Sequence, residues 1–388
     1  MASVERRERN GKKRWYARYR TMDGKQRTKT FDLKRDAEAF LVEVEASKQR
    51  GAFVDPRRSA LTVGGWADGW LTAQADLSPT TRERYRVAIE AHIKPRWGEV
   101  KLSDVSHAEV QTWVTGLKMA PASARKTHRV LSMVLAYAVK DGRLAVNPAV
   151  GISLPRVVES EKRFLSHEEV HKLAEAVGED YALVVRFLAY TGLRWGEMAA
   201  LKVSRLDFPR RRIVVAESVT PVRGKMTFGP TKGHERREVP MPRFLIAELK
   251  RQVAGRDEAD LVFTGSRGAV MRSQTFQRAA LKDAAIEMRL ATMTDRVDKK
   301  GNPIYADVFH PHELRHTAAS LAIASGADVK VVQQMLGHKS ATMTLDLYGH
   351  LFGDRLDVVA EAMEAARVSA LADVYPLCTG PELRAVSA

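Results

Sequence analysis

The sequence predicts an α+β protein that is mainly helical and is built in three parts. Near the N-terminus, aromatic and cationic residues alternate about a turn, which predicts a small three-stranded β-sheet followed by a helix. Apolar residues then recur at helical spacing from Thr62 to Ile152, which predicts a helical bundle. The C-terminal half mixes helical periodicity with short strand-like runs. This predicts a mixed α/β domain that holds a small antiparallel sheet.

The first part spans residues 1–55 and is strongly basic. Up to Phe31 it contains eleven Lys or Arg residues against three acidic ones, with aromatic residues between them. Asp23-Gly24 favours a tight hairpin turn, and a helix is expected from Asp32 or Lys34 to about residue 49. A small sheet with cations on one face can lie in a DNA groove, and a basic disordered tail is the alternative. The candidate DNA contacts here are Arg14, Arg18, Arg20, Lys25 and Arg27.

The second part, residues 61–153, follows a linker at 51–60 in which proline, glycine and charge replace the apolar pattern. Ser78-Pro79 is typical of a helix start, and Asn147-Pro148 is typical of a helix stop. Cationic residues crowd two of the expected helices, which suggests that the bundle also contacts phosphate. For each of them a solvated surface position is the alternative. These residues are Arg82, Arg84, Arg86, Arg125, Lys126 and Arg129.

The third part, residues 160–372, begins after a hinge at 155–160 and opens with a capping box, Ser166 to Glu169. A mostly apolar run is interrupted by TGLRWGE, so Arg194 and Glu197 must be paired or functional. An unpaired buried charge costs several kcal/mol. Strands are expected at 212–220, 225–228 and 236–241, and helices at 243–253 and 273–289. The turn between the last two strands places Lys232 at a hairpin tip, and 294–307 is expected to be a charged loop.

The segment from His310 to His350 gathers cationic and proton-carrying side chains around a tyrosine. Two helical stretches are joined by a short turn, and Gly337 supplies a left-handed stop to the second. His312 and Arg315 stand three residues apart, which places both on one face of a helix. The glycine stop then turns the chain and presents His338. These groups are therefore expected to converge.

Charge and composition limit the classes of partner. The 388 residues carry 63 Lys or Arg against 47 Asp or Glu, a net charge of +16 and a pI near 9.9, which favours nucleic acid. A basic membrane-surface protein is the alternative, but no apolar run approaches the roughly 20 residues needed to span a bilayer. No signal-peptide core stands near Met1. The single cysteine, Cys378, excludes an intrachain disulfide and a Cys-based zinc site, which fits a reducing cytoplasm.

The motifs TGLRWGE, HELRHTAAS, LGHKS and LDLYGH resemble those of the tyrosine recombinases, and specifically of phage-type integrases. The resemblance is close in the third part. In the second part it rests on the helical pattern, and in the first part only on the general character of a basic hairpin. The implied catalytic residues are Arg194 with its structural neighbour Glu197, Lys232, His312, Arg315, His338 and the nucleophile Tyr348. His310, His316 and His350 are expected to be supporting or capping residues.

These residue types suit transesterification of a phosphodiester without a metal ion or another cofactor. Guanidiniums at Arg194 and Arg315 can clamp the nonbridging oxygens with bidentate bonds. The phenol of Tyr348 has an ordinary pKa near 10, so it needs nearby cations and a base, for which His312 is the candidate. Lys232 can protonate the departing 5′-oxygen. The expected product is a 3′-phosphotyrosyl enzyme and a free 5′-hydroxyl, which can be resealed to another strand without ATP.

The resemblance also implies partners. The first part would bind arm-type DNA sites, the other two parts would clamp the core site, and a homotetramer would assemble on two duplexes. The segment 354–372 is a candidate helix for docking onto a neighbouring protomer. A host DNA-bending protein and an excision factor are candidate partners that the sequence leaves open, as is the function of the tail at 373–388.

Three other functions share some of these features. HELRH also matches the zinc metalloprotease helix, but Ala319 and Ala322 stand where an extended zinc motif would need Gly and His. A non-catalytic helix-turn-helix regulator explains the charge, but not the joint presence of Arg194, Lys232 and Tyr348. A type IB topoisomerase would share the chemistry without needing the arm-binding part.

Overall fold

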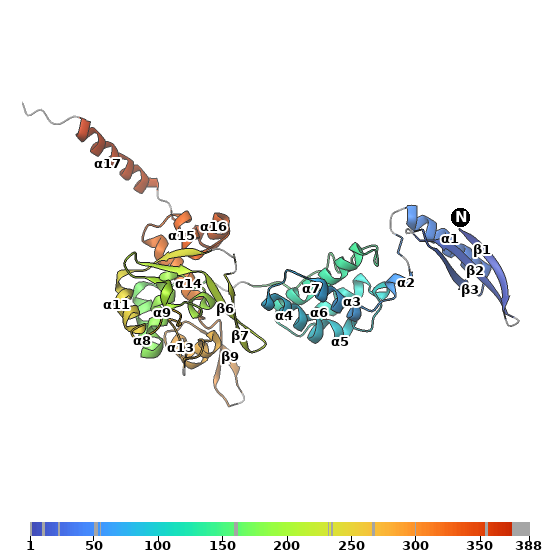
Figure 1. Ribbon diagram of the computed structural model, residues 1–388, viewed down its shortest axis with the longest axis horizontal. Coiled ribbons are helices and arrows are strands. Elements are labelled where there is room, and N and C mark those ends of the chain that lie inside the picture. The colour runs from blue at the N-terminus through green and yellow to red at the C-terminus, as the bar shows by residue number, and fades with distance from the viewer. Residues whose placement is uncertain are drawn as a thin grey trace, which may run out of the picture. The chain divides into compact units, whose positions relative to one another are not determined.

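The computed structural model of the protein describes residues 2–9, 12–21, 24–49, 53–54, 56–158, 162–231, 233, 236–265, 268–298, 300–353 and 356–374 (Figure 1). The chain divides into two compact units, Met1–Glu159 and Ser160–Ala388. Helices predominate and every sheet is small and antiparallel among the described residues. The predicted class, α+β and mainly α, is confirmed.

The N-terminal sheet has the strand order β1 (Ser3–Arg9), β2 (Lys12–Arg20) and β3 (Gln26–Phe31), and α1 (Lys34–Gln49) packs on one face. Gly24 has a φ of 77°, the left-handed conformation that the turn requires. Ala17 and Tyr19 on β2 are buried against α1. The predicted hairpin and helix are confirmed, and the alternative of a disordered tail is wrong.

The helical part of the N-terminal unit has its own core, in which Trp97, Ile89, Leu131 and Leu135 are fully buried. Ser78 caps α4 by accepting a hydrogen bond from the backbone N–H of Thr81, as a helix start of this type should. The helices are α2 (Pro56–Ser59), α3 (Val63–Ala73), α4 (Pro79–Ala88), the π-turn η1 (Ile89–Ile93), α5 (Lys94–Trp97), η2 (Leu102–Asp104), α6 (His107–Gly116) and α7 (Pro121–Lys140).

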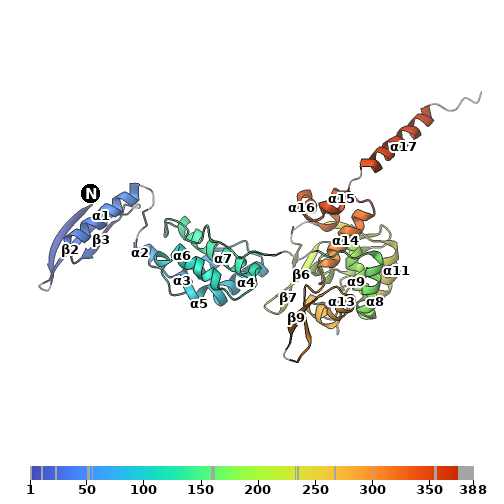
Figure 2. The same cartoon turned by 180° about the vertical axis from the view of Figure 1, so that it is seen from behind.

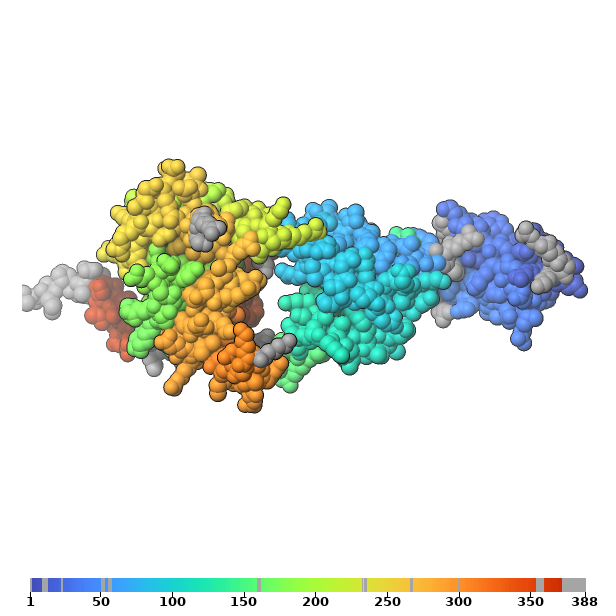
Figure 3. Space-filling view, turned by 90° about the horizontal axis from the view of Figure 1, so that it is seen from below, coloured from blue at the N-terminus to red at the C-terminus, as the bar shows by residue number. Residues whose placement is uncertain are grey.

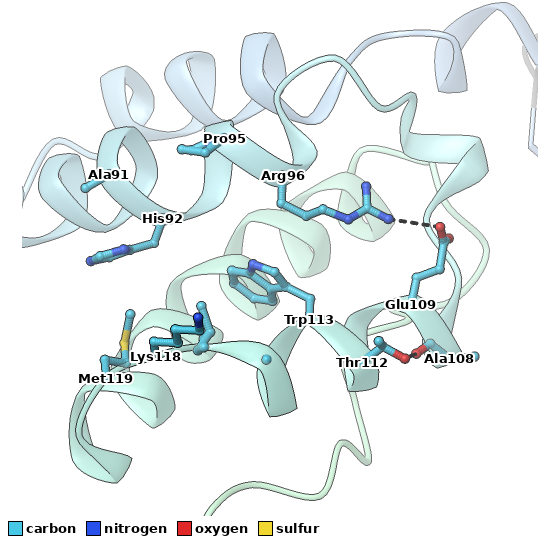
Figure 4. A pocket seen from close by; sticks show the side chains of 12 residues that line it. Ala91, His92, Pro95, Arg96, Ala108, Glu109, Thr112, Trp113, Lys118 and Met119 are labelled. Carbon is cyan, nitrogen blue, oxygen red and sulfur yellow. Dashed lines mark hydrogen bonds and ion pairs between the residues drawn. The ribbon is translucent and has the colours of Figure 1, made fainter.

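An open cavity of about 640 Å³ lies between η1, α5 and α6 (Figure 4). Trp113 forms part of its wall, and an ion pair between Arg96 and Glu109 crosses one side at 3.0 Å. None of the predicted catalytic residues lines this cavity. It is therefore separate from the candidate active site.

The C-terminal unit combines helices with three small sheets among its described residues, and segments far apart in the sequence share one surface (Figure 3). Its strands are β4 (Leu206–Asp207), β5 (Arg212–Val215), β6 (Glu217–Val222), β7 (Lys225–Pro230), β8 (Arg237–Pro240), β9 (Thr292–Val297) and β10 (Pro303–Ala306). Its first helices are α8 (His167–Ala176), α9 (Glu179–Thr191), α10 (Trp195–Ala199), η3 (Val203–Arg205), α11 (Arg243–Gln252), α12 (Ser273–Phe276), η5 (Gln277–Leu281) and α13 (Lys282–Glu287).

The expected strand pairing is wrong in one respect. The run 212–220 divides into β5 and β6, which belong to different sheets: β5 pairs with β4 and β8, whereas β6 pairs with β7. Arg223 and Gly224, both with positive φ, form the tight turn between β6 and β7. The strands β7 and β8 therefore belong to different sheets and do not form the expected hairpin.

The expected charged loop at 294–307 is also wrong, because β9 and β10 form an antiparallel hairpin. The hairpin projects from the body of the unit in both ribbon views (Figures 1 and 2). Asp298 accepts hydrogen bonds from the backbone N–H groups of Lys300 and Asn302, which closes the turn. A turn built on an aspartate in this way needs no Asn-Gly pair.

The last helices are α14 (Glu313–Ala324), α15 (Val329–Leu336), α16 (Ala341–Tyr348), η6 (Gly349–Leu351) and α17 (Leu356–Val374). Asp328 caps α15 by accepting from the N–H of Val331, and Gly337 ends it in the left-handed conformation, as predicted. Val359, Met363 and Val368 on α17 are exposed. In the described part of the chain, no helix combines the length and apolarity that a membrane span requires.

Candidate active site

Arg194 is positioned by the end of α9. Gly192 stops that helix with a φ of 65°, and a Cβ at Gly192 would lie 2.7 Å from Leu336 Cδ2, so a larger residue here would be strained and would have to displace the Leu336 side chain on α15. Arg194 then caps α10. Its Nη1 donates to Glu197 Oε1 at 2.9 Å, and its backbone N–H donates to Glu197 Oε2 at 2.9 Å. The motif TGLRWGE is therefore a helix stop followed by a charged cap.

Arg237 is a member of the site that the sequence motifs did not indicate. It opens β8, and its guanidinium binds Glu197 in bidentate fashion at 3.0 and 2.7 Å. Its Nε also donates to the carbonyl of Met335 at 3.1 Å. The paired arginines lower the pKa of Glu197 to about 2 despite the opposing effect of burial. Glu197 therefore remains ionised and holds two guanidiniums in place.

Arg315 is buried on α14 and is only 3% exposed. Its guanidinium donates to the carbonyls of Gly192, at 2.6 Å, and of Leu336, at 2.5 Å. These bonds tie α14 to the ends of α9 and α15. Burial, together with the nearby charge of Arg194, lowers the pKa of Arg315 to about 9, so the side chain is still cationic at neutral pH.

Tyr348 ends α16 and is only 1% exposed. Its hydroxyl lies 2.7 Å from Nδ1 of His316, the residue after Arg315. Its ring is parallel to that of His338, with centroids 6.4 Å apart. Burial raises the pKa of Tyr348, and the charge of Arg315 opposes this only in part. The hydroxyl therefore stays protonated in the absence of a base.

The other two histidines of the motifs differ in exposure. His312 precedes α14 and is exposed, and its ring centroid lies 5.1 Å from that of His316. His338 is buried, and its Nδ1 is 3.0 Å from the hydroxyl of Thr344. Burial lowers the pKa of His338 to about 4, and neighbouring arginines act in the same direction. Lys232 lies outside the described residues.

These elements leave a cavity of about 600 Å³ beside the buried charges. Arg194, Arg237 and His338 line it, together with Lys330 and Lys339. The guanidiniums of Arg194, Arg237 and Arg315 lie near the buried carboxylate of Glu197. The other carboxylate that lines the cavity among the described residues, Glu238, pairs with Arg210 at 3.4 Å. A surplus of buried positive charge is stabilised by an anion, and planar guanidiniums suit phosphate.

Replacing Arg237 with methionine is expected to destabilise the fold by about 3–5 kcal/mol, because it leaves the buried carboxylate of Glu197 partly unpaired. The matched control is Arg210→Met. Arg210 contacts Glu238, the neighbour of Arg237, at 3.4 Å, but its side chain is 66% exposed, so the loss should stay below about 1 kcal/mol. Urea unfolding of both variants measures the difference. Equal losses would contradict the role given to Arg237.

Two buried imidazoles should make the fold acid-sensitive. Burial lowers the pKa of His316 to about 4, as it does for His338. The unfolded chain takes up these protons at about pH 6.5, so the free energy of unfolding is highest above that pH and falls as the pH drops toward 4. Between pH 7 and pH 5 the expected loss is about 1–2 kcal/mol per histidine. Glu197 adds to the pH dependence of the free energy of unfolding only below about pH 4.5. Urea unfolding at both pH values measures the loss, and a constant value would contradict it.

The predicted DNA contacts of the first part lie on two faces of the sheet. Strand alternation places Arg14, Arg18 and Arg20 on the face away from α1, where Arg18 pairs with Glu5 at 2.7 Å. Arg27 stands opposite Tyr19, on the face that α1 covers. Lys25 is exposed next to the turn. The open face therefore carries three of the five candidate cations.

The predicted contacts of the bundle also separate into two groups. Arg82 donates to the carbonyls of Leu71, at 2.9 Å, and of Gln74, so it caps α3. Arg86 pairs with Glu83 at 2.6 Å. Arg84 is exposed on α4. The remaining predicted contacts lie on the exposed surface of α7, and Arg125 reaches the carbonyl of Pro155 at 3.2 Å. The residues of this second group are Arg125, Lys126 and Arg129.

These contacts favour neither the zinc metalloprotease nor the helix-turn-helix regulator. Nδ1 of His316 is directed at Tyr348, and the described residues contain no group of three His, Cys, Asp or Glu side chains that could hold a metal. The second helix of the helix-turn-helix candidate, α15, buries Val332, Met335 and Leu336 in the core of the unit. Its backbone also binds Arg237 and Arg315.

Two regions of the chain match known family models. Residues 163–354 match the phage integrase family, and residues 62–118 match the N-terminal SAM-like domain of phage integrases. The integrase of Mycobacterium phage D29 is 27% identical over 82% of this chain and 84% of its own length.

Two solved structures share the fold. The Tn1549 transposon integrase in complex with circular intermediate DNA has a TM-score of 0.63 at 18% identity, covering 79% of this chain and 99% of that one. A lambda integrase tetramer bound to a Holliday junction has a TM-score of 0.52 at 20% identity, covering 87% and 96%.

Proposed function

This chain belongs to the phage integrase family, and from that we propose that it is a site-specific DNA recombinase that cleaves and rejoins strands through Tyr348. The observation that carries the proposal is the cluster of three guanidiniums around one carboxylate, next to a buried tyrosine. An anionic phosphodiester supplies the charge that this cluster lacks.

The proposed chemistry combines groups that lie together in the structure with Lys232, whose role is taken from the resemblance to the family. Arg194 and Arg315 bind the nonbridging oxygens of the phosphate, whose negative charge grows in the transition state. Glu197 and Arg237 hold Arg194 in position. The oxygen of Tyr348 attacks phosphorus, and the departing 5′-oxygen takes a proton from Lys232. Because one phosphodiester replaces another, the broken strand can be rejoined without an external energy source.

The partners of the reaction follow from charge and family. Arg14, Arg18 and Arg20 on the open face of the N-terminal sheet contact arm-type DNA, and Lys126 and Arg129 on α7 contact the core site. The lambda integrase with the same fold assembles as a tetramer on a Holliday junction, and this chain would act as a homotetramer on two duplexes. A DNA-bending protein and an excision factor are candidate accessory partners.

The experiment that tests the function uses a nicked suicide substrate, from which the cleaved strand cannot be rejoined. The protein is expected to accumulate a covalent adduct at the 3′-phosphate and to exchange strands between two substrates. Both activities should survive excess EDTA, because the fixed guanidiniums supply the positive charge. Relaxation of supercoils without exchange would indicate a topoisomerase. Loss of activity in EDTA that zinc restores would indicate a metallohydrolase.

A further inference from the structure

We propose that His316 is the base that takes the proton of the Tyr348 hydroxyl during strand cleavage, a task for which the sequence pattern favours His312. The inference rests on the proposed function. Its central observation is the 2.7 Å distance between Nδ1 of His316 and the hydroxyl oxygen of Tyr348. A candidate base must lie within hydrogen-bond reach of the proton that it removes, and His316 does.

The surroundings of His316 keep its imidazole neutral, so that it can accept a proton. Burial lowers the pKa of His316 to about 4, and His312, Lys162, Arg315 and His310 add to the effect by charge. The ring is therefore neutral at neutral pH. For the proposed step, Nδ1 accepts the hydrogen bond from the phenol, and Nε2 then carries the ring proton of the neutral imidazole.

Substrate binding improves the match between acid and base. A bound phosphodiester places negative charge beside the ring and the nearby guanidiniums, which raises the pKa of His316 toward neutrality. Arg315 lies on the same turn of α14 and favours the phenolate form of Tyr348. A phosphate clamped by Arg315 therefore meets the nucleophile and its base together.

The proposed step is balanced. The O–H bond of Tyr348 breaks and its proton passes to Nδ1 of His316. The oxygen of Tyr348 forms the bond to phosphorus, and the bond from phosphorus to the 5′-oxygen breaks. During rejoining, the incoming 5′-hydroxyl attacks the phosphotyrosine, and the imidazolium of His316 returns its proton to the departing oxygen of Tyr348. The proton that His316 takes during cleavage is therefore the one that it returns to Tyr348 during rejoining.

The test compares His316→Ala in two backgrounds, one with natural Tyr348 and one with a fluorinated tyrosine at 348 whose phenol ionises near neutral pH. Adduct formation on the suicide substrate is measured under single-turnover conditions. In the natural background the rate should fall about 10²–10⁴-fold, the usual contribution of general base catalysis. In the fluorinated background the loss should be below about tenfold, because the nucleophile no longer needs a base.

Two further variants sharpen the test. His316→Asn keeps a hydrogen-bond acceptor near the position of Nδ1 but cannot take a proton, so it should be as slow as His316→Ala. His171→Ala on α8, where the side chain is 66% exposed, is the matched control and should react like the wild type.

Each outcome decides a separate point. A similar loss in both backgrounds, or full rescue by His316→Asn, would show that His316 only supports the structure. A wild-type rate in His316→Ala would also overturn the inference. If the wild-type protein itself forms no adduct, the proposed function fails with it.

Discussion

Tyr348→Phe is expected to bind duplex DNA with the affinity of the wild type and to form no covalent adduct. The substitution removes the attacking oxygen but leaves the guanidiniums of Arg194 and Arg315 in place. Loss of an enzyme's nucleophile lowers the rate by at least about 10⁴-fold. Denaturing electrophoresis of the suicide-substrate reaction measures the adduct, and gel retardation measures binding.

The stability of Tyr348→Phe must be measured as well, because loss of the hydroxyl leaves Nδ1 of His316 without its partner. Such a buried group costs about 1–3 kcal/mol. Urea unfolding therefore accompanies the activity assay. Tyr305→Phe is the matched variant, since Tyr305 lies on β10, within the projecting hairpin. An adduct that persisted in Tyr348→Phe, or an equal loss in Tyr305→Phe, would contradict the assignment of the nucleophile.

Arg315→Lys is expected to lower the rate of adduct formation about 10²–10³-fold at saturating DNA. Lysine keeps the positive charge but cannot donate to the carbonyls of Gly192 and Leu336 while also clamping a phosphate in bidentate fashion. The loss should appear in the single-turnover rate and much less in DNA affinity, because the clamp acts on charge that develops in the transition state.

The comparison for Arg315→Lys is Arg186→Lys. Arg186 is also partly buried and pairs with Glu248, but it lies on α9 outside the candidate site. That variant should cleave at the wild-type rate. A loss in Arg315→Lys confined to DNA affinity would argue that Arg315 serves binding alone.

The sequence predicted those features that short-range rules control. The hairpin turn at Gly24, the Asp328 cap and the Gly337 stop each depend on residues within one turn of chain, and the pairing of β2 with β3 follows from alternation. By contrast, residue spacing alone does not bring Arg194 to Arg315 and Tyr348, and their expected convergence depended on the resemblance to a family.

The features that were missed depend on contacts between distant segments. Arg237 reaches Glu197 only because β8 pairs with β5 and passes the end of α15, and no local pattern marks it. The turn at Arg223-Gly224 places an arginine in the left-handed region, where Asn or Gly is usual, so its signal was weak.

His316 shows a different limit of sequence reasoning. Its spacing from His312 suggested a metal motif, and its position after Arg315 suggested a supporting role. The direction of its ring depends on where α16 ends, and only the packing of α16 against α14 brings Tyr348 to it. One hydrogen bond between elements that are 32 residues apart therefore changes which histidine is the candidate base.

Peptide mapping of a trapped covalent DNA adduct tests the assignment of Tyr348 as the nucleophile most directly. The wild-type protein is reacted with the suicide substrate in EDTA, digested with a protease and a nuclease, and the modified peptide is identified by mass. We expect a nucleotide remnant joined through its 3′-phosphate to Tyr348 in the peptide that contains LDLYGH. A remnant on any other residue, or an adduct through a 5′-phosphate, would contradict this assignment.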